Sequence, residues 1–177
     1  LARALRGLAR GAEARQRIDE FLSRRAGNFA MYLIRGDLAV DDGQPGEALT
    51  WYHRAEAIAP HEEKVLFQIA QALRAVGRVE QAESYERRWQ ERRELTSQFQ
   101  EAQKRAAREP KSVDAHFEVG RLALKLGQES LGLRWLAEAL KLDPEHRETH
   151  RVLADFFEKK GDQPAAEFHR RRAANRP

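Results

Sequence analysis

The sequence predicts an all-α fold built from antiparallel helix pairs. Two observations predict it: the composition and the repeated spacing of small residues. Ala, Leu, Glu, Arg and Gln are abundant among the 177 residues and Pro occurs only six times, which favours helices because these residues are strong helix formers. The chain is 34% charged and 41% hydrophobic, as expected for helices that each keep one face in water.

Two series of small residues recur at the same intervals of 34, 50 and 34 positions. The first consists of Gly43, Gly77, Gly127 and Gly161, and the second of Ala48, Ala82, Gly132 and Ala166. Because both series share one irregular step, we infer internal repeats. We expect the first series to end helices in the left-handed conformation that suits glycine. The second series is expected where two helices cross closely.

The residues around these positions resemble the tetratricopeptide repeat, a 34-residue pair of helices. The first full copy carries the pattern as Tyr32, Arg35, Gly36, Ala39, Ala48, Tyr52, Ala55 and Pro60. The resemblance covers about residues 29–177. It departs from the family at Arg35, where an apolar residue is usual, and at Glu86, where an aromatic residue is usual. It implies a right-handed superhelical solenoid of antiparallel helix pairs.

The spacing divides the chain into repeats within one predicted domain, residues 1–177. The predicted segments are a degenerate repeat at 1–28, a repeat at 29–62, a repeat with a 16-residue helical insertion at 63–112, and repeats at 113–146 and 147–177. Asn28 is expected to cap the helix that follows it.

The insertion predicts one extended helix at about residues 79–108. No Gly or Pro lies between Gly77 and Pro110, and apolar residues stay on one helical stripe through this segment. Such a helix is about 45 Å long. The alternative is a bend near Arg92–Thr96 that produces a separate extra helix.

The family resemblance implies that the first helix of each pair lines a concave groove that holds the ligand. Carried over by repeat position, the predicted partner-binding residues are Leu33, Lys64, Phe67, Gln71, Arg74, Phe117, Arg121, Lys125 and Arg151. The same face holds Asp37, Val40, Leu124, Asp155 and Lys159.

This predicted groove is aromatic and basic at its middle. Phe67 and Phe117 are of the kind that anchors interfaces, and arginines suit carboxylates. We therefore predict a protein or peptide partner with apolar and acidic side chains. The alternative is that the long helix covers both Phe residues and the charges are merely solvated. The carboxylate clamp of chaperone-tail-binding members is absent, because its positions hold Leu33, Asp37, Gln68, Asp114 and Glu118.

Catalytic chemistry is not expected. The chain has no Cys, which excludes disulfides, thiolate metal sites and a Cys nucleophile, and it lacks the common phosphate-binding and hydrolase motifs. His146 and His150, four residues apart, could share a helical face as metal ligands, but nothing completes the set, so we predict core or capping roles. No cofactor and no metal are predicted.

The net charge of +4 is spread over 32 basic and 28 acidic interspersed residues, so nucleic acid is not the expected partner. The run Arg170–Arg172 is read as a solvated helix end. No stretch is apolar enough to span a membrane. The chain begins at Leu1 and is read as a fragment of a longer protein, cytoplasmic or periplasmic.

Two further functions remain as alternatives to a scaffold or adaptor. The chain could be a regulatory or targeting module of a larger enzyme or membrane-anchored protein. It could also form homo-oligomers through the long helix, with Leu95 and Phe99 pairing between chains.

Overall fold

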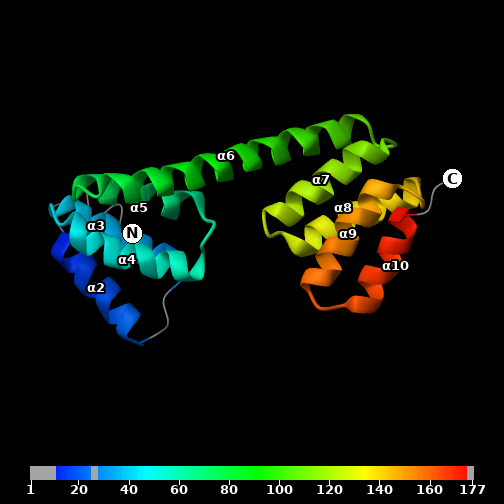
Figure 1. Ribbon diagram of the computed structural model, residues 1–177. Coiled ribbons are helices and arrows are strands. Elements are labelled where there is room, and N and C mark those ends of the chain that lie inside the picture. The colour runs from blue at the N-terminus through cyan, green and yellow to red at the C-terminus, as the bar shows by residue number, and fades with distance from the viewer. Residues whose placement is uncertain (1–10, 25–27, 175–177) are drawn as a thin grey trace. The chain divides into compact units, whose positions relative to one another are not determined.

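The computed structural model describes residues 11–24 and 28–174, and all regular secondary structure in them is helical (Figure 1). The helices are α2 (Gly11–Arg24), α3 (Phe29–Asp41), α4 (Pro45–Ile58), α5 (Glu63–Ala75), α6 (Val79–Arg108), α7 (Val113–Lys125), α8 (Glu129–Leu142), α9 (Arg147–Lys159) and α10 (Gln163–Ala174). The all-α prediction is confirmed, as is the antiparallel pairing of helices.

The chain forms two compact units, residues 1–93 and 94–177, which we call unit 1 and unit 2. The boundary lies within α6, which is one 30-residue helix from Val79 to Arg108. The extended helix is therefore confirmed, and the separate extra helix after a bend at Arg92–Thr96 is not formed. The single five-repeat domain stays a prediction.

In unit 1, α3 packs mainly on α4, and α4 on α5. Their buried side chains form one cluster around Tyr52 and Ile69, and it includes Ala82 of α6. A Cβ at Gly36 would lie 2.3 Å from Cε1 of Tyr52, so glycine is required where α3 meets α4. Helix α2 joins through Ile18, which packs with Leu38 of α3.

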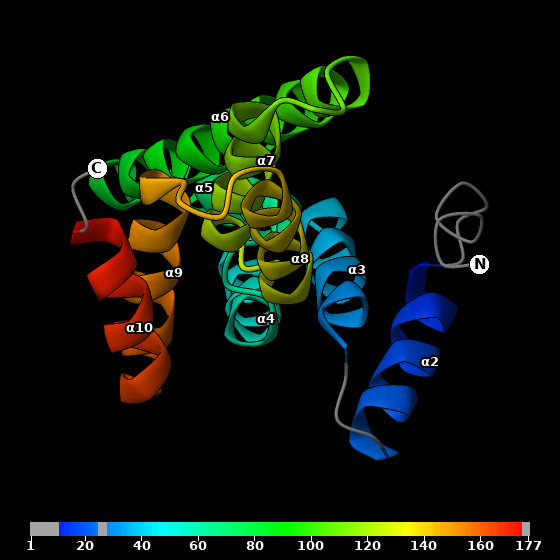
Figure 2. The same cartoon turned by 90° about the vertical axis from the view of Figure 1, so that its right-hand side faces the viewer.

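In unit 2, α7 pairs with α8 and α9 with α10, and Figure 2 shows the second pair side by side. The later part of α6 packs on α7 through a cluster that contains Phe99 and Val119, with Leu95 against it. Phe99 is only 8% exposed. Phe99 is therefore not available to pair between chains, because the core of unit 2 already uses it, whereas Leu95 is half-buried. Homo-oligomerisation through the long helix stays a prediction.

The helix ends follow the predicted chemistry. Gly43, Gly77, Gly127 and Gly161 have φ between 72° and 78°, and Asn28 accepts a hydrogen bond from the Met31 amide at 3.0 Å. These predictions are confirmed.

The unusual Arg35 is buried, and two acidic side chains contact it. Its Nε lies 3.0 Å from Asp19 and its second terminal nitrogen 2.8 Å from Glu47. Its guanidinium also lies over the Trp51 ring at 4.9 Å. These partners stabilise a charge at a position where an apolar residue is usual.

Candidate peptide-binding groove

Unit 2 contains a groove of about 460 Å³ between α7, α9 and the start of α8. Three partly buried apolar side chains, Leu124, Val152 and Phe156, line it together with charged ones. The charged lining residues are Arg121, Lys125, Glu129, Asp155, Lys159 and Lys160. An apolar surface with four cationic and two acidic side chains around it suits a ligand that is partly apolar and partly anionic.

The lysines of this groove differ in their availability. Lys160 lies 2.7 Å from Glu129 and over the Phe156 ring at 5.7 Å, so its charge is already paired. Lys125 and Lys159 are exposed, and neither has an ion-pair partner among residues 11–24 and 28–174. These two cations are the ones that an incoming carboxylate would meet without displacing a neighbour.

Arg121 is held by its own helix rather than by the groove. Its Nε donates to Glu118 at 2.9 Å and a terminal nitrogen donates at 2.5 Å. The paired carboxylate raises the pKa of Arg121 above its ordinary value. A ligand carboxylate would therefore compete with Glu118 for this guanidinium.

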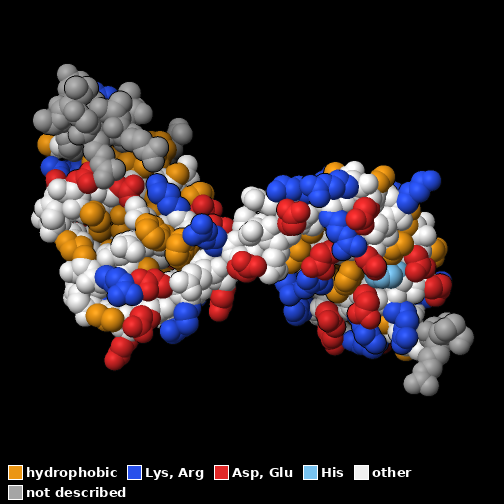
Figure 3. Space-filling model, turned by 90° about the horizontal axis from the view of Figure 1, so that it is seen from above, with side chains coloured by type: hydrophobic (Ala, Val, Ile, Leu, Met, Phe, Trp, Pro, Cys, Tyr) orange, Lys and Arg blue, Asp and Glu red, His pale blue; other side chains and the backbone are white. Residues whose placement is uncertain are grey.

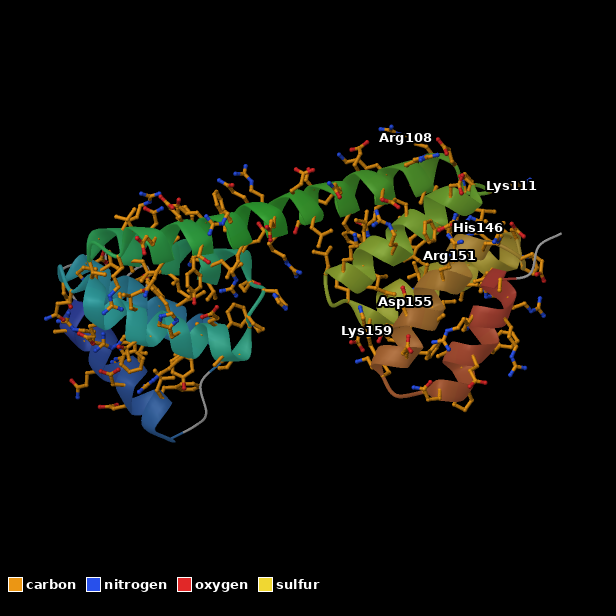
Figure 4. The ribbon with its side chains drawn as sticks, viewed as in Figure 1. Arg108, Lys111, His146, Arg151, Asp155 and Lys159 are labelled. Carbon is orange, nitrogen blue, oxygen red and sulfur yellow. The ribbon has the colours of Figure 1, made fainter. Side chains whose placement is uncertain are left out.

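Helix α9 presents three charged side chains in succession, Arg151, Asp155 and Lys159 (Figure 4). Their spacing of four residues places them on one helical face. Asp155 and Lys159 line the groove, whereas Arg151 lies outside its lining and pairs with Glu148 at 3.0 Å.

Unit 1 has a smaller counterpart of this groove, about 140 Å³ in volume, at equivalent positions. Its lining comprises Asp37, Val40, Pro45, Tyr52, Gln68, Gln71, Ala72 and Ala75. Seven of these lie 84 positions before a lining residue of the unit 2 groove, as Asp37 does before Arg121. The same repeat positions therefore build both grooves.

Asp37 bridges the unit 1 groove with hydrogen bonds. Its Oδ1 accepts from Tyr52 of α4 at 2.9 Å and from Gln68 of α5 at 2.7 Å. Lys64 of α5 lies 3.7 Å from its other oxygen. In unit 2 the equivalents of Asp37, Tyr52 and Gln68 are Arg121, Leu136 and Val152, which cannot form this bridge.

The other predicted groove residues of unit 1 are engaged within it. Leu33 is 3% exposed in the core, so its prediction as a partner-binding residue is wrong. Phe67 is 38% exposed and packs on Trp89 of α6, with ring centroids 5.2 Å apart, so the long helix covers part of it. Arg74 donates two hydrogen bonds to Glu86 of α6, and this pairing lowers the pKa of Glu86.

Of the nine predicted partner-binding residues, the unit 2 groove contains Arg121 and Lys125, and the unit 1 groove contains Gln71. Phe117 packs on His146, with ring centroids 5.3 Å apart. Sequence reasoning missed Glu129, Val152, Phe156 and Lys160. The prediction used only the family's five contact positions on the first helix of each pair. The groove walls also include Glu129 at the start of a second helix, and the positions between those five on α9.

The predicted core and capping histidines are found in those roles. His146 caps α9 by accepting from the Thr149 amide, and His150 is 3% exposed. In the described part of the chain, no group of three or more His, Asp or Glu side chains could hold a metal ion.

The C-terminal arginines are paired: Arg170 with Glu158, Arg171 with Glu167 and Arg172 with Glu145. Basic and acidic side chains are interspersed over the face seen in Figure 3. None of the helices in residues 11–24 and 28–174 is long and apolar enough for a membrane span.

Comparison with known proteins supports the repeat. Residues 1–63 match the family model described as "Tetratricopeptide repeat", which includes the segment 1–28 predicted as a degenerate copy. The predicted tetratricopeptide repeat is thereby confirmed for this part of the chain. No curated protein matches the chain.

Several solved structures resemble the chain at low identity. One is titled "Crystal structure of MamA", with 14% identity, 98% of this chain and 92% of that chain covered, and a TM-score of 0.47. Another is MamA from Desulfovibrio magneticus RS-1, at 16% identity, 97% and 88% coverage and a TM-score of 0.47. A third is YrrB, titled a TPR protein with an unusual peptide-binding site. The match has 18% identity, covers 90% of this chain and 71% of that chain, and has a TM-score of 0.46. All three TM-scores lie below 0.5, so the function inferred below depends on this chain's own residues.

Proposed function

We propose that this tetratricopeptide-repeat protein is a protein-interaction scaffold whose unit 2 groove binds a peptide segment carrying apolar and acidic side chains. The observation that carries the proposal is a pair of exposed lysines, Lys125 and Lys159, which have no ion-pair partner in the described part of the chain and lie beside the apolar lining of one groove. An apolar side chain of the ligand would pack on Leu124, Val152 and Phe156. Flanking carboxylates would meet the two lysines.

Ion pairs at an exposed groove rim contribute mainly to specificity and association rate. The apolar contact should therefore supply most of the affinity, and the lysines should select acidic over basic sequences. Because rim charges are screened by salt, the preference for acidic peptides should weaken as ionic strength rises.

Fluorescence anisotropy with two synthetic peptides tests the proposal. One peptide alternates Leu and Glu, and the other carries Lys in place of every Glu. We expect the acidic peptide to bind more tightly. The double variant Lys125→Glu with Lys159→Glu should lose at least about tenfold in affinity for it, equivalent to about 1.4 kcal/mol.

The matched control is Lys111→Glu. Lys111 is also an exposed lysine, and it lies near the opposite end of α9 from Lys159 (Figure 4). This variant should bind the acidic peptide like the unsubstituted protein. An equal loss in the control, or equal binding of the two peptides, would contradict the groove as the site.

A further inference from the structure

Two histidines join the helices of the last pair through their ring nitrogens. Nδ1 of His150 on α9 lies 2.8 Å from Nδ1 of His169 on α10. Nε2 of His150 lies 2.9 Å from the carbonyl oxygen of Pro144. His150 is 3% exposed, so both of its ring nitrogens depend on protein partners.

These contacts show which ring nitrogens of the two histidines carry a hydrogen. A carbonyl oxygen can only accept, so Nε2 of His150 carries a hydrogen and donates it to Pro144. In neutral His150 the Nδ1 atom is then an acceptor. The hydrogen between the rings must therefore belong to Nδ1 of His169, which donates to His150.

The hydrogen bond between the rings can keep one added proton, because the neutral partner ring can change its tautomer and accept through Nδ1. A second proton would place two N–H groups against each other across 2.8 Å. His169 faces a related penalty, because burial, and then repulsion from His150, lowers its pKa below the ordinary 6.5. The folded pair therefore binds fewer protons than the same two histidines in an unfolded chain.

The surroundings offer no compensating negative charge. Within the described residues, no carboxylate oxygen lies within 4 Å of either ring. Aromatic rings flank the pair instead: Phe157 stacks on His169 at 5.6 Å, and Phe168 lies edge-on to both histidines. An imidazolium in this apolar setting is disfavoured by desolvation.

Several charged groups on the packed elements have partners of their own. Asp114 of α7 lies 3.4 Å from His146, and Lys141 of α8 lies 2.7 Å from Glu138. On α10, Arg170 pairs with Glu158 and Arg172 pairs with Glu145, while Arg147 of α9 donates to the Ala173 carbonyl at 3.1 Å. None of these ion pairs includes His150 or His169.

We propose that the His150–His169 pair is a pH-sensitive latch that holds α10 against α9 at neutral pH and releases it on acidification. The sign follows from proton binding: between the ordinary histidine pKa of 6.5 and the lower folded value, the released state binds more protons. The stability of the α9–α10 pair is therefore complete above pH 6.5 and falls below it.

The latch regulates the groove if the proposed function holds. Helix α9 contributes Val152, Asp155, Phe156, Lys159 and Lys160 to the groove lining. Release of α10 uncovers the opposite face of α9, which includes the buried Leu153 and Ala154. A loosened α9 would no longer hold the groove wall, so peptide binding should weaken below pH 6.5.

Hydrogen exchange of the whole chain, corrected for the intrinsic pH dependence of exchange, tests the latch. Between pH 7.5 and pH 5.5, we expect the protection of α10 to fall, by up to about tenfold, while that of α7 stays constant. One proton of differential binding changes an equilibrium tenfold for each pH unit below the pKa of the released state. Equal protection of α10 at both pH values would overturn the proposal.

The variant His169→Gln isolates the pair. A Gln amide can donate to Nδ1 of His150 but does not take up a proton, so α10 should lose less protection on acidification than in the unsubstituted chain. The control His61→Gln changes an exposed histidine of unit 1 and should keep the full pH dependence. If His169→Gln does not fold, NMR titration of the unsubstituted rings decides: ordinary protonation of both with α10 in place refutes the latch.

The two proposals fail separately. Loss of α10 protection without any peptide binding, at either pH, would reject the groove and keep the latch. Peptide binding with α10 protection that does not depend on pH would reject the latch and keep the groove.

Discussion

Unit 1 and unit 2 place grooves at the same repeat positions but give them opposite chemistry. In unit 1, Asp37 connects α3 to α4 and α5 by hydrogen bonds across a groove of about 140 Å³. In unit 2, the equivalent residues are Arg121, Leu136 and Val152, and the groove measures about 460 Å³. The comparison teaches that side chains at a few equivalent positions decide whether a repeat groove is closed by its own bonds or left for a ligand.

The largest expected effects come from the helix crossings that the two units share. A Cβ at Gly36 would meet the buried Tyr52 ring at 2.3 Å, and one at Gly120 would meet the Leu136 side chain at 2.7 Å and its backbone nitrogen at 2.9 Å. We expect Gly36→Ala and Gly120→Ala each to lower the free energy of unfolding by about 3 kcal/mol. Urea denaturation measures the loss, and hydrogen exchange locates it in unit 1 or unit 2.

The control is Gly46→Ala, because no atom lies within 4 Å of a Cβ at that position. Ala is the better helix former, so this variant should be as stable as the unsubstituted protein or slightly more so. A Gly120→Ala protein of unchanged stability would mean that α7 and α8 can separate at little cost.

An intermediate effect is expected from transplanting the unit 2 chemistry into unit 1. Asp37→Arg with Gln68→Val removes the hydrogen-bonded bridge, which should lower the free energy of unfolding by about 1–2 kcal/mol. The same change should let unit 1 bind the Leu–Glu peptide, measured by anisotropy in the Lys125→Glu, Lys159→Glu background.

Gln71→Val serves as the matched control for this transplant. Gln71 lines the same groove, yet its substitution leaves the Asp37 bridge intact, so neither stability nor peptide binding should change. If the transplanted groove gains no affinity, the open shape of the unit 2 groove must depend on more than the bridging residues.

The smallest expected effect is a difference between the two units in the pH at which each loses stability. In unit 1, Tyr85 and Arg88 of α6 each contact Glu56 of α4 at 2.9 Å. Burial alone would raise the pKa of Glu56, but hydrogen bonds from His53, Tyr85 and Arg88 together lower it below its ordinary 4.5. This carboxylate therefore stabilises unit 1 fully above pH 4.5, and the contribution is lost as pH falls through the lower folded value.

We therefore expect acid to loosen α10 below pH 6.5 and to weaken the α4–α6 contact only below pH 4.5, as followed by hydrogen exchange. Glu56→Gln should remove part of the pH dependence of unit 1, whereas Glu80→Gln, at an exposed site of α6, should not. Loosening of the α4–α6 contact already at pH 6 would contradict this order.

The grooves show why the repeat was easier to predict than the site. The spacing of the glycines predicts the helix ends, because the backbone at Gly43 and Gly127 must adopt the left-handed conformation that ends a helix. Whether a groove residue can contact a ligand depends instead on which side chains of neighbouring helices pack on it. Leu33 and Phe117 occupy the same repeat position, yet Leu33 is buried in the core and Phe117 packs on a histidine.

The sequence by itself predicted the helix pairs, the helix ends at Gly43, Gly77, Gly127 and Gly161, and an extended helix at about residues 79–108. These features follow from local propensity and from periodic spacing, which a linear chain records directly. Only the tertiary structure decided that Arg74 pairs with Glu86 and that Asp37 closes one groove by hydrogen bonds. It also decided that Lys125 and Lys159 of the other groove have no ion-pair partner among the residues that the structure describes. Ion pairs and hydrogen bonds join residues that are distant along the chain, so their partners depend on packing rather than on spacing.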